Sequence, residues 1–176
     1  MNYVYEFTNG RKITKREFIH WFQKKFLYTI RKFKMISQRD VIGYENKGDF
    51  RGVVLENLLN LYTEKSQVDI VKLPSKKITK IAVPNTTDTE ADKISSIIIK
   101  GNASKLKDAG PIIGKTIKPL YLFLDKEVLL YAKLMKLKCR KTTESEDKLG
   151  KFVESLEEKH PEIKHSIIKS YLNLYS

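Results

Sequence analysis

Residues 39–62, RDVIGYENKGDFRGVVLENLLNLY, join a short apolar run to a longer one through a polar loop. The first run, at 39–44, has the length and side chains of a buried strand. The loop at 45–52 is polar and contains glycine. Beyond it, apolar side chains recur at helical spacing, namely Val53, Val54, Leu55, Leu58, Leu59 and Tyr62. The stretch therefore predicts the order strand, loop, helix.

Two more strands are predicted after that helix. β-Branched runs occupy 68–73 and 78–83, and Pro74 and Pro84 end them. Only residues 74–77 lie between the runs, whereas a connection between neighbouring parallel strands needs about a dozen residues or more. The two runs therefore cannot be neighbouring parallel strands of an ordinary βαβ unit.

Helices are predicted for much of the remaining chain. We expect them at 15–34, 87–100, 125–137, 149–156 and 163–172. Thr87 and Glu90 have the spacing of a capping box. Gly101 fits a left-handed C-cap, and Asp125 fits an N-cap. Residues 102–118, rich in glycine, proline and lysine, are expected to form a loop.

The alternation of strands and helices predicts an α/β fold. We expect a small, mainly parallel sheet flanked by helices, with a ligand crevice at the carboxyl ends of the strands. The chain divides into a basic helical segment at 1–36, an α/β domain at 37–138 and a C-terminal helical segment at 139–176.

The chain is strongly basic. Its 34 lysines and arginines against 21 acidic residues give a formal net charge of +13 over 176 residues, and only six of the basic residues are arginines. Lysine is a mobile point charge, which suits attraction to a phosphate backbone better than the reading of base edges. We therefore expect a polyanionic partner. The alternative is a lysine-rich surface set by genome composition or by growth at high temperature.

Positive charge is concentrated in the predicted helix at 15–34. Its basic residues are Lys15, Arg16, Lys24, Lys25, Arg31, Lys32 and Lys34, against Glu17 alone. Phe18, Phe22, Phe26 and Ile30 recur every four residues, so one face packs while the other is basic. We predict that the basic face meets RNA phosphates. A solvated face of a core helix and a membrane-surface helix are the alternatives.

Several classes of site are excluded or not indicated. Cys139 is the only cysteine, which excludes a disulfide within the chain and a zinc or iron–sulfur site made of its own thiolates. The longest apolar run, at 120–124, is far too short to span a membrane. His20, His160 and His165 have no partner at catalytic or metal-binding spacing, and we interpret them as surface or cap residues. We expect a cytoplasmic protein without metal or cofactor.

Five segments carry motifs that occur together in one family. Three are continuous: ITKREFI at 13–19, IRKFKMI at 30–36 and LEEKHPEIK at 156–164. The other two are interrupted. One has IA, Asp88, EA and KG in this order over 81–101, and the other has KPL, DKEV and YA over 118–132. In this combination the chain resembles the tRNA wobble-uridine 2-thiolation family, the PP-loop ATPases of the adenine nucleotide alpha-hydrolase-like superfamily. The resemblance covers most of the chain. It implies a PP-loop fold and a role in tRNA processing.

The chain departs from that family at the phosphate loop. The family's loop has the form SGGxDS, in which glycines let backbone amides close around pyrophosphate. Residues 45–50 here read ENKGDF, so a carboxylate stands where an anion should bind. Only Gly48 and Asp49 remain as nucleotide-binding candidates. The family's zinc ligands are replaced by Thr14 and Glu17.

The other catalytic positions implied by the resemblance are sparse. Asp88 is one of two aspartates that the family carries at this place, and Cys139 falls where one family cysteine is expected. The family's long middle section, with a second strand–helix unit and catalytic cysteines, is reduced to the short stretch between Lys65 and Lys80. A lone thiol supplies neither cooperating cysteines nor a cluster held by three. Asp49, Asp88 and Cys139 are therefore remnant candidates.

These observations predict a pseudoenzyme that pairs with a catalytic 2-thiolation paralog as a heterodimer and helps to bind tRNA. The family offers a precedent, because eukaryotic wobble-uridine thiolation uses one catalytic subunit and one degenerate partner of the same fold. Two alternatives stay open. One is a minimal nucleotide-dependent tRNA sulfurtransferase that uses Gly48, Asp49 and Cys139, and the other is a stand-alone RNA-binding protein.

Overall fold

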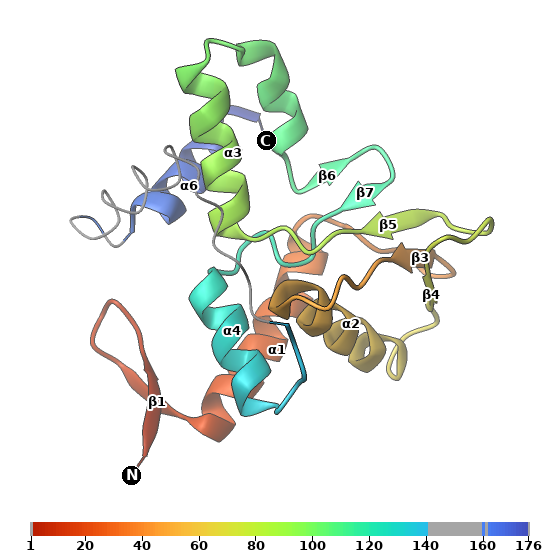
Figure 1. Ribbon diagram of the computed structural model, residues 1–176, viewed down its shortest axis with the longest axis vertical. Coiled ribbons are helices and arrows are strands. Elements are labelled where there is room, and N and C mark those ends of the chain that lie inside the picture. The colour runs from red at the N-terminus through yellow and green to blue at the C-terminus, as the bar shows by residue number, and fades with distance from the viewer. Residues whose placement is uncertain (1, 141–159, 161, 176) are drawn as a thin grey trace.

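A five-stranded sheet forms the centre of the computed structural model, which describes residues 2–140, 160 and 162–175 (Figure 1). The strand order is β4-β3-β5-β7-β6. The strands are β3 (Val41–Tyr44), β4 (Asp69–Lys72), β5 (Lys80–Ala82), β6 (Ile112–Ile113) and β7 (Thr116–Ile117). All pairings are parallel except that of β6 with β7. The predicted mainly parallel α/β fold is confirmed.

Three helices pack together in the larger apolar core. They are α1 (Lys15–Lys32), α2 (Phe50–Thr63) and α4 (Asp125–Leu134), and α4 contacts both of the others. Phe18, Phe22 and Phe26 of α1 are all buried, as their spacing predicts. The ring of Phe22 stacks on that of Tyr131 from α4, with 4.3 Å between the centroids. Ile42 of β3 belongs to the same core.

A second apolar cluster lies at the other end of the molecule. It joins α3 (Thr87–Ile99), the 3₁₀ helix η1 (Ala103–Ala109) and α6 (Ile163–Tyr175), which stand together at the top of Figure 1. Ile94, Tyr121 and Ile168 are buried there. Tyr121 also lies in the segment that leads into α4, so this segment connects the two cores.

The connection from β4 to β5 passes over β3. β4 and β5 both run parallel to β3 and lie on opposite sides of it, so residues 73–79 must cross it. Side chains alternate along a strand, so position 43 faces away from the core side of Ile42. At that position a Cβ would lie 2.7 Å from Cδ2 of Leu73, and Gly43 carries none. The prediction that these strands are not neighbours is confirmed.

Some predicted boundaries were wrong. Thr86, not Thr87, is the N-cap of α3, and Leu124, not Asp125, is the N-cap of α4, where the Glu127 carboxylate accepts the Leu124 amide. α4 ends at Leu134 rather than at 137. Gly101 has a φ of +67°, as expected for a left-handed cap.

Several elements were not predicted at all. A hairpin of β1 (Tyr3–Glu6) and β2 (Lys12–Thr14) precedes α1. The stretch 102–118, expected to be a loop, contains η1 and the β6–β7 hairpin. The helix predicted at 149–156 lies outside the described residues, and the division into three segments stays a prediction. No helix in the described part of the chain is long and apolar enough to cross a membrane.

Candidate functional site

The loop at 45–49 leads from the carboxyl end of β3 into the N-terminus of α2, where a PP-loop would hold phosphate. Asp49 is the N-cap of α2, and its carboxylate accepts the Gly52 amide at 3.2 Å. The side-chain oxygen of Asn46 accepts the Gly48 amide at 2.8 Å. Gly48 has a φ of +82°, which turns the chain toward the helix. The amides of Gly48 and Gly52 are thus bonded to the chain's own side chains.

Gly52 makes this self-capping possible. A Cβ at this position would lie 2.9 Å from Oδ1 of Asp49 and 3.2 Å from Oδ1 of Asn46. The absence of a side chain therefore lets two oxygen atoms of the loop approach the first turn of α2. In a phosphate loop, glycine gives the same close approach to an anion. Sequence reasoning missed Asn46 and Gly52, although both lie beside the candidate residues Gly48 and Asp49.

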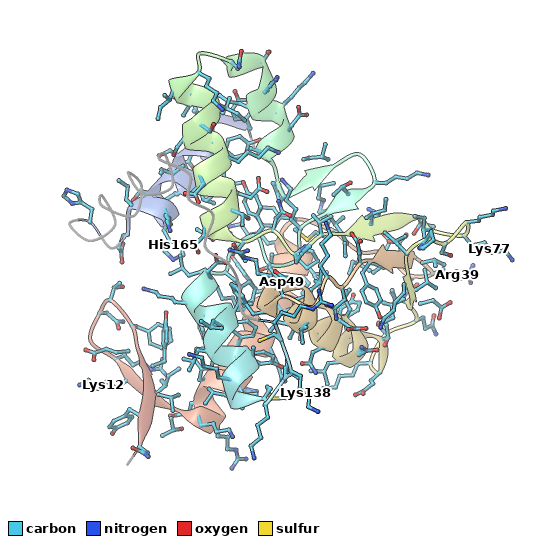
Figure 2. The ribbon with its side chains drawn as sticks, in the orientation of Figure 1. Lys12, Arg39, Asp49, Lys77, Lys138 and His165 are labelled. Atoms are coloured by element: carbon cyan, nitrogen blue, oxygen red, sulfur yellow. The ribbon has the colours of Figure 1, made fainter. Side chains whose placement is uncertain are left out.

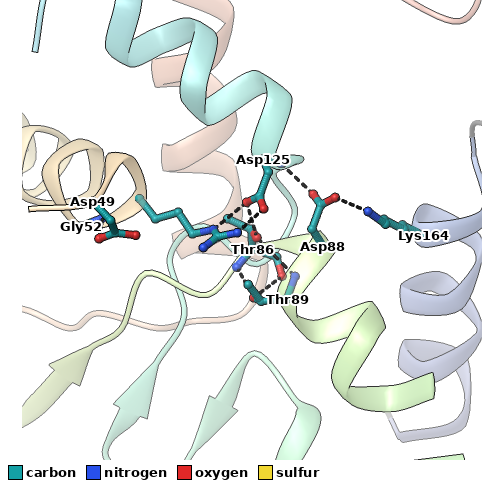
Figure 3. A network of polar contacts seen from close by, with 8 residues as sticks. Asp49, Gly52, Thr86, Asp88, Thr89, Asp125 and Lys164 are labelled. Atoms are coloured by element: carbon teal, nitrogen blue, oxygen red, sulfur yellow. Dashed lines mark hydrogen bonds and ion pairs between the residues drawn. The ribbon is translucent and has the colours of Figure 1, made fainter. Parts of the chain in front are cut away.

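Arg51, in the first turn of α2, is paired with Asp125 at the start of α4 (Figure 3). Its Nε donates to Oδ1 at 2.8 Å, and its terminal nitrogen donates to Oδ2. The bonds to Asp125 and the charges of two more carboxylates raise the pKa of the guanidinium, although burial opposes this. Those carboxylates are Asp49 and Asp88. The positive charge facing them is therefore supplied by the protein itself.

Asp88, at the start of α3, connects two further helices to this network (Figure 3). One of its oxygens accepts the Asp125 amide at 2.7 Å, and the other accepts the Lys164 ammonium of α6 at 2.6 Å. The Thr86 hydroxyl donates to Asp125 at 2.8 Å. We call Asp49, Arg51, Thr86, Asp88, Asp125 and Lys164 the strand-end network. It joins α2, α3, α4 and α6.

Residues that carry the family resemblance also form ion pairs elsewhere in the fold. Lys118 of KPL and Glu90 of the 81–101 segment form an ion pair of 2.9 Å, and their side chains are only 3% and 0% exposed. Burial lowers the pKa of Lys118, while Glu90 opposes the shift. Glu127 of DKEV accepts bonds from the Lys25 ammonium at 2.7 Å and from the Tyr5 hydroxyl at 3.1 Å. These motif residues therefore hold separate elements together.

Cys139 lies next in sequence to a residue that touches the phosphate-loop position. The amide of Arg140 donates to the Gly48 carbonyl at 2.7 Å. The Cys139 thiol is exposed. The structure thus brings the remnant candidates Asp49, Asp88 and Cys139 to the same end of the sheet, where Asp49 and Asp88 are engaged in the strand-end network.

The basic residues predicted on the first helix divide into two groups. Lys15, Arg16, Lys24, Arg31, Lys32 and Lys34 are exposed. Lys25 corrects the expectation, because its ammonium pairs with Glu127 and lies 4.8 Å and 4.9 Å from the ring centroids of Trp21 and Phe123. Burial lowers its pKa, although Glu127 opposes this shift.

Exposed positive charge is not confined to α1. Figure 2 shows Arg39 and Lys77 at the far end of the sheet and Lys12 on the N-terminal hairpin. All three are exposed, as is Lys138. Arg39 has a φ of +65°. The positive potential therefore extends over several sides of the molecule.

The residues present do not fit the groups that a PP-loop fold implies. A nucleotide pyrophosphate needs free loop amides, whereas those of Gly48 and Gly52 are bonded to side chains and three carboxylates lie nearby. An iron–sulfur cluster needs several thiolates, whereas the sequence holds Cys139 alone. Within the described residues, no group of three or more His, Cys, Asp or Glu side chains is arranged so that it could hold a metal ion.

Comparisons with known proteins identify a solved structure of similar fold. Neither the protein-family models nor the curated proteins give a match. Among solved structures, the chain is similar to the U34-tRNA thiolase NcsA from Methanococcus maripaludis, determined with its 4Fe–4S cluster. The TM-score is 0.79 at 19% sequence identity, and the match covers 98% of this chain and 84% of that chain. At this identity the similarity establishes the fold.

Proposed function

We propose that this chain is a non-catalytic partner subunit in the 2-thiolation of the tRNA wobble uridine. It would support tRNA binding and a catalytic paralog. The observation that carries the proposal is the strand-end network, in which the chain's own side chains engage the groups that a nucleotide would use. The solved structure of similar fold is a thiolase that acts on U34-tRNA.

The contrast between changed and kept residues supports the loss of catalysis. The loop at 45–50 differs from a phosphate loop and caps its own helix. By contrast, the pairs Lys118–Glu90 and Lys164–Asp88 join segments that carry the resemblance. A chain that keeps its packing contacts while losing its reactive loop can still dock against a partner and attract phosphate.

A partner surface is offered by exposed apolar residues on α3 and α6. Ile98 and Leu174 are 60% and 78% exposed, and they line a groove of about 280 Å³ between these helices. Contiguous exposed apolar surface is typical of a protein contact. The net charge of +13 opposes pairing of two copies of this chain. We therefore place a different chain, the catalytic paralog, on this groove.

A tagged pull-down from the native cell extract tests the proposal, with mass spectrometry of bound proteins and sequencing of bound RNA. We expect an intact PP-loop thiolase together with tRNA. The variant Leu174→Asp should lose the thiolase, while the matched variant Asn173→Asp, at the exposed position beside it, should keep it. Recovery of RNA without any thiolase would favour a stand-alone RNA-binding protein.

Calorimetry with ATP tests the alternative of a minimal enzyme. We expect no binding at millimolar ATP, because the Asp49 carboxylate occupies the helix N-terminus. Binding that is abolished by Asp49→Ala would show that the loop still holds a nucleotide, and the chain would then be a catalytic candidate.

A further inference from the structure

A cavity of about 620 Å³ lies away from the strand-end network. It opens between the end of α1, the segment 110–112 and α6. Its lining includes Lys32, Phe33, Lys107, Pro111, Tyr171 and Tyr175. None of these residues belongs to the strand-end network. The volume falls within the range of about 300–1,000 Å³ that is usual for small-molecule sites.

Aromatic side chains that pack against other rings line one side of this cavity. The rings of Tyr171 and Tyr175 stack with 4.8 Å between centroids and 21° between planes. Tyr171 is 5% exposed and Tyr175 is 50% exposed, so a buried ring supports an exposed one. The ring of Phe33 packs edge-on against the ring of Tyr121, with 5.9 Å between the centroids. An exposed ring with such backing is a stacking platform for a nucleobase.

Two lysines line the same cavity. The Lys32 ammonium lies 3.5 Å from the Tyr28 hydroxyl and 5.8 Å from the centroid of the Phe33 ring. Lys107 is exposed on η1. No described carboxylate forms an ion pair with either lysine. The exposed residues Arg31 and Lys34 continue the positive charge at the end of α1.

We propose that this cavity binds one unpaired nucleotide of an RNA strand. The base stacks on Tyr175, and the adjacent phosphates meet Lys32 and Lys107. An unpaired nucleotide is required because the bases of a duplex are already stacked on their neighbours. The continuing charge of Arg31 and Lys34 favours a strand over a free mononucleotide. The inference deepens the proposed function, on which the identification of the strand as tRNA rests.

Fluorescence anisotropy with a labelled single-stranded RNA decamer tests the cavity, using a hairpin duplex of the same composition for comparison. We expect Tyr175→Ala to weaken single-strand binding by about 5- to 140-fold, because base stacking on an aromatic ring contributes about 1–3 kcal/mol. Tyr175→Phe should bind like the parent. Circular dichroism checks that the variants fold.

Salt dependence tests the two lysines. For a single strand, the slope of log K against log salt should fall in magnitude by about 0.7 for each lost phosphate contact. We therefore expect a change of about 1.4 for the double variant Lys32→Gln, Lys107→Gln. Lys77→Gln, at the far end of the sheet (Figure 2), is the matched control and should change the slope much less.

The outcomes separate this inference from the proposed function. Three results would each overturn the proposed nucleotide site: no single-strand binding, equal binding by the parent and Tyr175→Ala, or a slope change per lysine that is as large for Lys77→Gln as for the double variant Lys32→Gln, Lys107→Gln. If these occur while the chain still recovers a thiolase and tRNA, the proposed function stands without the cavity. If the cavity variants behave as expected but no thiolase is recovered, the cavity stands and the partner role fails.

Discussion

Lys118 and Glu90 form the most thoroughly buried ion pair of the described residues. Glu90 also accepts a bond from the side-chain nitrogen of Asn85 at 2.6 Å. Removing one member of a buried pair leaves an uncompensated charge, which typically costs about 3–5 kcal/mol. We therefore expect Lys118→Met to lower the free energy of unfolding by about that amount, measured by urea unfolding.

The double variant Lys118→Met, Glu90→Gln is the control for that measurement. It removes both charges and keeps an acceptor for Asn85, so it should be more stable than Lys118→Met alone. If Lys118→Met unfolds at the parent's urea concentration, the pair does not contribute as its burial implies.

A pH effect is expected from Glu56 on α2. Burial alone would raise its pKa, but bonds from Lys72, Tyr44 and Asn46 outweigh this and lower it. A carboxyl with a lowered folded pKa stabilises the fold above its unfolded pKa of about 4.3. That contribution should be lost as the pH falls below about 4.3 and through the folded pKa.

Urea unfolding between pH 3 and 7 measures this effect, with Glu56→Gln as the reference. The parent should lose more stability than Glu56→Gln over the acidic part of the range. Parallel curves for the two proteins would contradict the assignment. Burial and Glu56 raise the pKa of Tyr44 to about 12, so Tyr44 keeps its proton throughout this range.

At the scale of elements, the crossover at 73–79 depends on the missing side chain of Gly43. A Cβ there would also lie 3.1 Å from Cγ2 of Ile78. We expect Gly43→Val to destabilise the fold by about 1–3 kcal/mol, the usual cost of overpacking. Thermal unfolding in the parent and in a Leu73→Ala background measures it. The loss should shrink in that background, and an equal loss in both would mean that Leu73 does not set the cost.

Long periodic elements could be predicted from the sequence, and very short ones could not. The four-residue spacing of Phe18, Phe22 and Phe26 predicted α1 almost to its ends. β7, by contrast, is only Thr116–Ile117, too short for any alternation to be visible. Its place beside β5 comes from pairing with residues far away in the sequence. The caps at Thr86 and Leu124 were missed by one residue. Thr86 and Thr87 carry the same hydroxyl, whereas Leu124 has no side-chain acceptor and its amide is bonded to Glu127 instead.

At the scale of the whole molecule, the sequence indicated only Asp49 and Asp88 of the strand-end network and none of the contacts between its residues. The sequence pointed to Gly48, Asp49 and Asp88 because they occupy motif positions. The bond between Lys164 and Asp88 depends on the packing of α6 against α3. The local sequence pattern does not encode this packing. Lys25 was assigned to the basic face because helical spacing alone does not show that α4 approaches it.

Under the proposed function, the net charge of +13 should make tRNA binding by this chain sensitive to salt. A slope of about −0.9 per neutralised phosphate means that two contacts already give a loss of about tenfold in affinity between 50 and 200 mM salt. We expect at least this loss by anisotropy. Lys24→Gln, on an exposed position of α1, should reduce the slope without changing the melting temperature.

Lys25→Gln, the neighbouring substitution, should have the opposite pattern. It removes the partner of the buried Glu127, so it should lower the melting temperature and leave the salt slope unchanged. Equal slopes for the parent and Lys24→Gln would show that the outer face of α1 does not meet the RNA.

The strand-end network also decides how the protein responds to small molecules. A fold that binds a nucleotide gains stability from it by mass action, in proportion to the logarithm of ligand concentration over the dissociation constant. Here the Asp49 carboxylate already caps α2, and the Asp125 carboxylate already pairs with the Arg51 guanidinium. Carboxylates of the chain itself therefore occupy the positions that a bound phosphate would take. Under the proposed function, we therefore expect the stability of the folded chain not to depend on the ATP concentration.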